Sequence, residues 1–97
     1  MEALDLRGLV PAPVTPFTRD GAVDYAAIKR LGSWLGGIDG VKGLTVLGHA
    51  GEGTFLTQAE QAKVIEAFRE SVDDRIPIIA GITLEGTMVS AEEAKRA

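Results

Sequence analysis

The side chains and backbone groups best suited to chemistry gather in residues 48–54, a stretch that we call the glycine loop and that contains the only histidine of the sequence. Its three glycines permit positive φ and leave backbone N–H groups exposed, an arrangement that can bind a carboxylate or a phosphate. No Lys-Ser or Lys-Thr pair follows, as a P-loop requires, and the Gly-x-x-Gly-x-Gly spacing differs from the dinucleotide fingerprint. Two interpretations stay open: an anion-binding loop, or a turn without function.

Three side chains in or near this loop could take part in chemistry. His49 could transfer protons, although a lone histidine is more often a structural residue whose ring is hydrogen-bonded. Glu52 could act as a general base, although a loop carboxylate that accepts bonds from backbone N–H groups is commoner. Thr15, at the end of an earlier apolar stretch, could orient a ligand through its hydroxyl or cap its own loop.

Three short apolar stretches are predicted to be the strands that position these residues. They span residues 8–15, 43–47 and 76–81. Because they are apolar on both faces, they suit parallel strands covered by helices. Ligands of parallel α/β folds bind beyond the carboxyl ends of the strands, so the loops of interest follow each strand. These loops are residues 15–17, 48–54 and 82–87.

An amphipathic helix is predicted after each strand. Asp24 is the expected N-cap of the first helix, and Thr57 with Glu60 forms a capping box for the second. Ser90 with Glu93 repeats that pattern and predicts the start of the third. Helical spacing favours packing of the following side chains: Tyr25, Ala27, Ile28, Leu31, Trp34, Leu35, Val64, Ile65, Phe68 and Val72.

Two local features modify the first unit. Pro11 and Pro13 lack backbone donors on the same side of the chain, so the first strand is predicted to be irregular. The pair Asp20-Gly21 predicts a two-residue hairpin, which would form a small flap between the first strand and its helix.

The predicted strands recur at a regular interval. They start near residues 9, 44 and 77, which gives a repeat of about 33 residues. A (β/α)8 barrel allots about 31 residues to each βα unit and a doubly wound sheet uses similar units, so the period alone does not choose between them. The sequence stops about two turns into the third helix without a C-cap. We therefore expect the N-terminal part of a longer protein, or a fragment stabilised by partners.

Composition excludes several classes of function. Fourteen acidic and ten basic side chains give a formal charge of −4, without the basic stripe that nucleic acids require. No cysteine and a single histidine exclude disulfide frameworks and four-ligand zinc patterns, and neither a metal nor a cofactor is predicted. The start lacks a signal-peptide pattern, and no apolar run approaches the ~20 residues that span a bilayer. A cytoplasmic protein that binds neither membranes nor nucleic acid is expected.

The lysines lie away from the candidate loops. Lys29, Lys63 and Lys95 fall in predicted helices, and Lys42 precedes the second strand, at the end opposite the glycine loop. A Schiff-base lysine must sit desolvated in the pocket with a lowered pKa. If the protein uses one, that lysine lies beyond residue 97.

Six motifs occur in the order and at the spacing of a known family. They are residues 12–17 (APVTPF), 20–24 (DGAVD), 40–44 (GVKGL), 48–52 (GHAGE), 56–60 (LTQAE) and 77–81 (PIIAG). Through them the sequence, from about Gly8 to its end, resembles the family of dihydrodipicolinate synthase and N-acetylneuraminate lyase. The resemblance implies an α/β fold, the (β/α)8 TIM barrel, usually a homotetramer. Residues 1–97 would form the N-terminal portion of that single domain, about its first three βα units.

The resemblance also implies a chemistry. In this family a lysine on the sixth strand forms a Schiff base with pyruvate or another 2-oxo acid, and aldol addition, retro-aldol cleavage or dehydration follows. His49 and Ala50 stand where the family carries two hydroxyl residues, one in a proton relay and one on the carboxylate of the 2-oxo acid. We therefore take His49 and Thr15 as catalytic candidates, and Gly48, Ala50 and Gly51 as substrate-binding candidates.

The leading hypothesis is a Schiff-base (class I) lyase or aldolase that acts on pyruvate or a related 2-oxo acid, with an aldehyde as a further substrate. The 97-residue span alone should not catalyse this reaction. The second hypothesis is a barrel that binds a 2-oxo acid or sugar acid without catalysis, motivated by the lost hydroxyl pair. A third is that the span is physiological and serves only in assembly.

Overall fold

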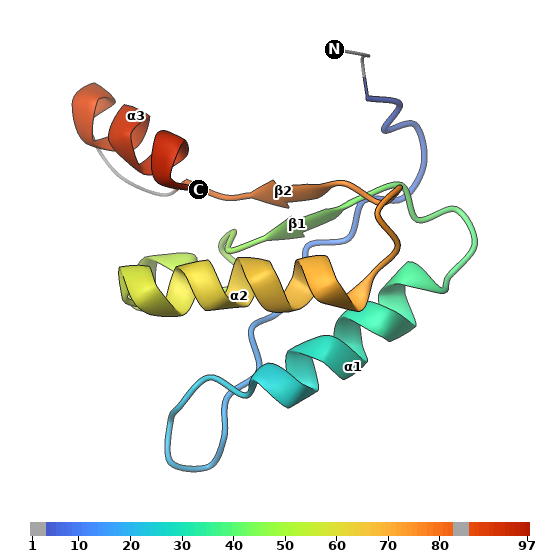
Figure 1. Cartoon of the computed structure of the whole chain (residues 1–97), viewed down its shortest axis with the longest axis horizontal. Coiled ribbons are helices and arrows are strands. Elements are labelled where there is room, and N and C mark those ends of the chain that lie inside the picture. Colours follow the sequence, from blue (N-terminus) through green and yellow to red (C-terminus); the bar gives the residue numbers. More distant parts are fainter. Residues whose placement is uncertain (1–3, 83–85) are drawn as a thin grey trace.

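A computed structural model describes residues 4–82 and 86–97 as a small α/β unit (Figure 1). In chain order the elements are α1 (Tyr25–Gly36), β1 (Leu44–Val46), the 3-10 turn η1 (Gly53–Phe55), α2 (Gln58–Ser71), β2 (Ile78–Ala80) and α3 (Thr87–Arg96). Strands β1 and β2 are parallel, with Leu44 opposite Ile78 and Val46 opposite Ala80. Helices α1 and α2 lie on the same side of this sheet in Figure 1. The second and third predicted strands are thereby confirmed, though shorter than expected.

The predicted first strand follows the free edge of β1 without becoming a regular strand. Leu9 forms an isolated parallel bridge with Val41, and the Pro11 carbonyl accepts a hydrogen bond from Thr45 N at 2.9 Å. Pro11 and Pro13 have no N–H to return to β1, so a continuous ladder cannot form along this edge. The predicted irregularity of this segment is confirmed.

The first two helices begin where the sequence predicts. The Asp24 side chain accepts a hydrogen bond from Ala27 N at 3.0 Å at the start of α1. At the start of α2, Glu60 N donates to Thr57 Oγ1 at 3.1 Å, and Thr57 N donates to Glu60 Oε1 at 2.9 Å. This reciprocal pair is a complete capping box.

The prediction that Ser90 starts the third helix is wrong. Helix α3 begins at Thr87, one turn earlier, with Gly86 as its N-cap at φ 95°. Ser90 N already donates to the Gly86 carbonyl at 3.0 Å, as an interior helical residue does. Glycine at position 86 accepts the positive φ with which the chain enters the helix, so the helix does not need the later cap.

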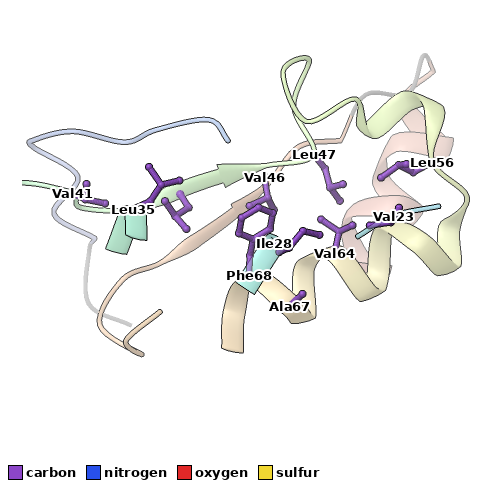
Figure 2. Packing of buried hydrophobic residues seen from close by; sticks show 11 residues of the cluster. Val23, Ile28, Leu35, Val41, Val46, Leu47, Leu56, Val64, Ala67 and Phe68 are labelled. Carbon is purple, nitrogen blue, oxygen red and sulfur yellow. The ribbon is translucent and has the colours of Figure 1, made fainter. Parts of the chain in front are cut away.

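The core lies between β1 and the facing sides of α1 and α2. Figure 2 shows Ile28 and Phe68 beside Val46, with Val64 further along α2. Ile28, Val46 and Val64 are fully buried, and Phe68 is 1% exposed. The two helices approach closely, since a Cβ on Gly32 would lie 1.9 Å from Ser71 Oγ.

Trp34 does not pack as the helical spacing predicts, because 66% of it is exposed. The buried face of α1 carries Ile28, Gly32 and Leu35. Trp34 precedes Leu35 by one residue and is therefore rotated about 100° away from that face. Tyr25, by contrast, packs partly against the core as predicted.

The predicted hairpin forms at residues 17–23, but its loop has three residues rather than two. Phe17 and Val23 form an antiparallel bridge, and Thr18 N donates to the Ala22 carbonyl at 2.7 Å. Gly21 closes the turn with φ 92°. A three-residue loop with glycine in the left-handed region is a common hairpin type. The pair Asp20-Gly21 therefore predicted the position of the hairpin correctly, but not the length of its loop.

Candidate active site

The glycine loop leaves the carboxyl end of β1 and is held by its own backbone. Glu52 N donates to the His49 carbonyl at 3.1 Å, and Gly53 N donates to the Gly48 carbonyl at 3.3 Å. Positive φ angles occur at Leu47 (60°), just before the loop, and at Glu52 (55°) within it, but not at the glycines of the loop. The glycines of the loop therefore do not adopt the positive φ that their lack of a side chain permits. Bulky residues with positive φ are uncommon and cluster at functional sites.

The glycines instead allow the backbone to pack around one carbonyl. A Cβ on Gly53 would lie 2.3 Å from the Leu47 oxygen, and a Cβ on Gly81 would lie 2.7 Å from the same oxygen. Gly81, just after β2, also donates from its N–H to the Val46 carbonyl at 2.8 Å. The Leu47 carbonyl is thus enclosed from both strand ends, which joins the loop after β1 to the loop after β2.

A buried hydrogen bond joins the first candidate loop to the second. Thr15 Oγ1 donates to the Gly51 carbonyl at 2.6 Å, and Thr15 is only 3% exposed. Thr15 therefore caps a neighbouring loop rather than its own. The structure brings the predicted residues Thr15 and Gly51 together at the carboxyl-end rim, although they are 36 positions apart in the sequence.

His49 and Ala50 project from this anchored base. Both are exposed, and within the described ranges the His49 ring makes no hydrogen bond. Glu52 is exposed as well, and among the described residues its carboxylate accepts no bond from a backbone donor.

The backbone of the loop also offers free donors. The N–H groups of His49, Ala50 and Gly51 donate to no other group in the part of the chain that the structure describes. Consecutive N–H groups without a protein partner can bind an anion such as a carboxylate. Unpartnered N–H groups of this kind are what the anion-binding interpretation of the loop requires.

The third candidate loop is described only in part, since Thr83, Leu84 and Glu85 lie outside the described residues. Ile82 lines a cavity together with Leu47 and Gly81, and with Glu93 and Arg96 of α3. Sequence reasoning missed Leu47 and Gly81 as residues that build the site. The position of Gly81 at the end of an apolar strand could have indicated its role. No feature of the sequence indicates a positive φ at Leu47.

The four lysines lie on other parts of the fold. Lys29 pairs with Glu70 at 3.1 Å between α1 and α2, and Lys42 N donates to the Leu9 carbonyl before β1 begins. Lys63 lies in α2 and Lys95 in α3.

Among residues 4–82 and 86–97, no three His, Asp or Glu side chains gather as metal ligands, and no helix is long and apolar enough to cross a bilayer.

Parallel strands joined by helices, with a glycine-containing loop beyond the carboxyl end of β1, are typical of the class of βα-repeat proteins that includes barrels and doubly wound sheets. A more specific result comes from known sequences. The model of the dihydrodipicolinate synthetase family matches residues 5–97. The chain belongs to this family.

Individual relatives agree with this membership. The 4-hydroxy-tetrahydrodipicolinate synthase of Xylella fastidiosa is 40% identical over 95 residues, which cover 97% of this chain and 31% of the relative. A crystal structure of dihydrodipicolinate synthase from Bacillus anthracis superposes with a TM-score of 0.87 at 31% identity, covering 97% of this chain and 32% of that one. The chain thus spans about a third of the length of the relatives it matches.

Two further solved structures widen the range of chemistry. The N-acetylneuraminate lyase of Mycoplasma synoviae superposes with a TM-score of 0.80 at 32% identity, covering 93% of this chain and 31% of the lyase. A chloride-inhibited dihydrodipicolinate synthase of Acinetobacter baumannii, determined in complex with pyruvate, superposes with a TM-score of 0.83 at 31% identity. That match covers 94% of this chain and 31% of the synthase. The solved structures that this chain resembles thus include both a synthase and a lyase.

Proposed function

We propose that residues 1–97 form the N-terminal portion of a single (β/α)8 barrel domain, about its first three βα units. The whole protein is then a Schiff-base (class I) lyase or aldolase that acts on pyruvate or a related 2-oxo acid. Family membership over residues 5–97 supports this, as does the pyruvate complex of the Acinetobacter baumannii relative. A cytoplasmic homotetramer is the assembly we expect.

The observation that carries the proposal is the row of free N–H groups in the glycine loop, beside the buried Thr15. The N–H groups of Ala50 and Gly51 bind the substrate carboxylate, and Gly48 keeps the entrance to the loop free of a side chain. Hydrogen bonds to an ionised acceptor are stronger than neutral ones, so two of them suffice to orient a small acid. His49, on the same loop, exchanges protons with the substrate.

We expect the reactive amine to come from outside the 97 residues, because Lys29 pairs with Glu70, Lys42 precedes β1, and Lys63 and Lys95 lie in the helices α2 and α3. The amine attacks the ketone carbon of the 2-oxo acid, water leaves, and the protonated imine withdraws electrons from the neighbouring carbon. The glycine loop contributes by holding the carboxylate while this carbon forms or breaks its bond.

Borohydride reduction of the full-length protein in the presence of pyruvate tests the proposal. We expect a stable mass increase equal to one reduced pyruvate adduct per subunit, located on a lysine outside residues 1–97. A parallel sample without pyruvate is the control. Failure to form an adduct with pyruvate or with other 2-oxo acids would contradict the proposal.

A second candidate function is a barrel that binds a 2-oxo acid or sugar acid without turnover. The observation in its favour is that Ala50 offers the ligand only its backbone N–H. A rise in melting temperature with ligand, without adduct or product, would favour this binding protein over the enzyme.

A further inference from the structure

The peptide unit between Gly51 and Glu52 is held at both of its ends. Its carbonyl accepts a hydrogen bond from Thr15 Oγ1 at 2.6 Å, and its N–H donates to the His49 carbonyl at 3.1 Å. Gly51 and Thr15 are both buried, so water does not replace the threonine hydroxyl easily. This unit directly follows the Ala50 and Gly51 N–H groups that we assign to the carboxylate.

The same bond maintains an unfavourable backbone conformation. Glu52 has φ 55°, in the left-handed region that non-glycine residues avoid. Rotation of the peptide unit between Gly51 and Glu52 would relieve this conformation, but it would turn the Gly51 carbonyl away from Thr15. An unpaired buried carbonyl is costly, so the threonine hydroxyl opposes the rotation.

We propose that Thr15 is a positioning residue: it fixes the conformation of the glycine loop and thereby sets the affinity for the 2-oxo acid carboxylate, without touching the substrate. This inference rests on the proposed function for its consequence, although its structural part stands independently. Its hydroxyl proton is already donated to Gly51, which leaves the substrate to the loop's own N–H groups.

Two variants of the full-length protein separate this role from general stability. Thr15→Val keeps the shape of the side chain and removes the donor, whereas Thr15→Ser keeps the donor. We expect Thr15→Val to raise the KM for pyruvate about tenfold with a smaller change in kcat, and Thr15→Ser to restore the KM to within about twofold. A variant that merely unfolds in part would instead lose kcat at unchanged KM.

Hydrogen exchange of the Glu52 amide gives a readout that needs no turnover. Its exchange should accelerate in Thr15→Val and stay near the native rate in Thr15→Ser. Native exchange of Glu52 in Thr15→Val would overturn the positioning role even if the wild-type protein forms a pyruvate adduct. Faster exchange in a protein that forms no adduct would leave the positioning of the loop intact and refute the proposed function instead.

Discussion

The glycine loop and the hairpin of residues 17–23 both turn the chain at glycines, yet glycine is required in the two turns for different physical reasons. A Cβ on Gly53 would lie 2.3 Å from a backbone oxygen, and Gly53 has no positive φ. Gly21 has φ 92°, and a Cβ there would meet nothing within 4 Å. The glycine loop is therefore defined by close packing of the backbone and the hairpin by backbone conformation. Substitutions of these glycines should therefore lower the unfolding free energy for different reasons and by different amounts.

The largest effect is expected at Gly53. In Gly53→Ala the new methyl group would clash with the Leu47 carbonyl, which cannot move without displacing β1, so the full-length protein should lose about 3 kcal/mol of unfolding free energy. Gly48→Ala is the matched control, because a Cβ at Gly48 meets nothing within 4 Å and should change stability by less than about 0.5 kcal/mol. Urea unfolding of both variants measures the difference. Equal losses would show that packing around Leu47 does not define the loop.

His49 tests whether the exposed part of the same loop serves chemistry rather than folding. His49→Ala in the full-length protein should lower kcat/KM about 100-fold, because a proton-transfer group is removed. Its unfolding free energy should stay within about 0.5 kcal/mol of wild type, since the side chain is exposed. His49→Gln keeps a hydrogen-bonding side chain that does not titrate near neutral pH. Steady-state rates of His49→Gln that match wild type would exclude proton transfer.

The hairpin should respond to conformation alone. Gly21→Ala places a side chain in the left-handed region and should cost about 1 kcal/mol, although no atom obstructs it. Gly21→Asn should cost less, because asparagine tolerates this region better. Thermal unfolding of the pair compares them. A loss in Gly21→Asn as large as in Gly21→Ala would point to a steric cause and erase the contrast with Gly53.

The smallest effect concerns Tyr25, at the start of α1. Burial, with a smaller contribution from the charge of Glu60, raises the pKa of the Tyr25 phenol above its ordinary value. The folded state therefore favours the neutral phenol, and this contribution to stability is present below about pH 10 and lost as the pH rises through the raised pKa. The unfolding free energy of Tyr25→Phe should accordingly fall less than that of wild type between pH 9 and pH 11. Parallel curves for the two proteins would contradict this.

Much of the fold could be predicted because its signals are local. Asp24, and Thr57 with Glu60, satisfy backbone donors within three residues, and those interactions depend little on the rest of the chain. The apolar runs before residues 48 and 82 are also local signals, and they correctly predicted the positions of β1 and β2. The capping pattern at Ser90 and Glu93 gave a wrong helix start, because it lies inside α3, whose N-cap is Gly86.

The rest depended on contacts across the sequence. Trp34 has helical spacing suited to packing, but only the direction of the sheet and α2 decides which face of α1 is buried. Thr15 and the glycine loop were correctly placed at one rim, since parallel strands share their carboxyl edge. The hydrogen bond to Gly51 and the left-handed Leu47 could not be foreseen, because both arise from the way the backbone packs there.

The central claim is that the backbone of the glycine loop binds the substrate carboxylate. A crystal structure of the full-length protein reduced with borohydride in the presence of pyruvate tests it most directly. We predict one carboxylate oxygen within hydrogen-bonding distance of Ala50 N or Gly51 N, with Thr15 still bonded to the Gly51 carbonyl. A carboxylate held only by side chains from outside residues 1–97, with the loop's N–H groups facing water, would contradict the account.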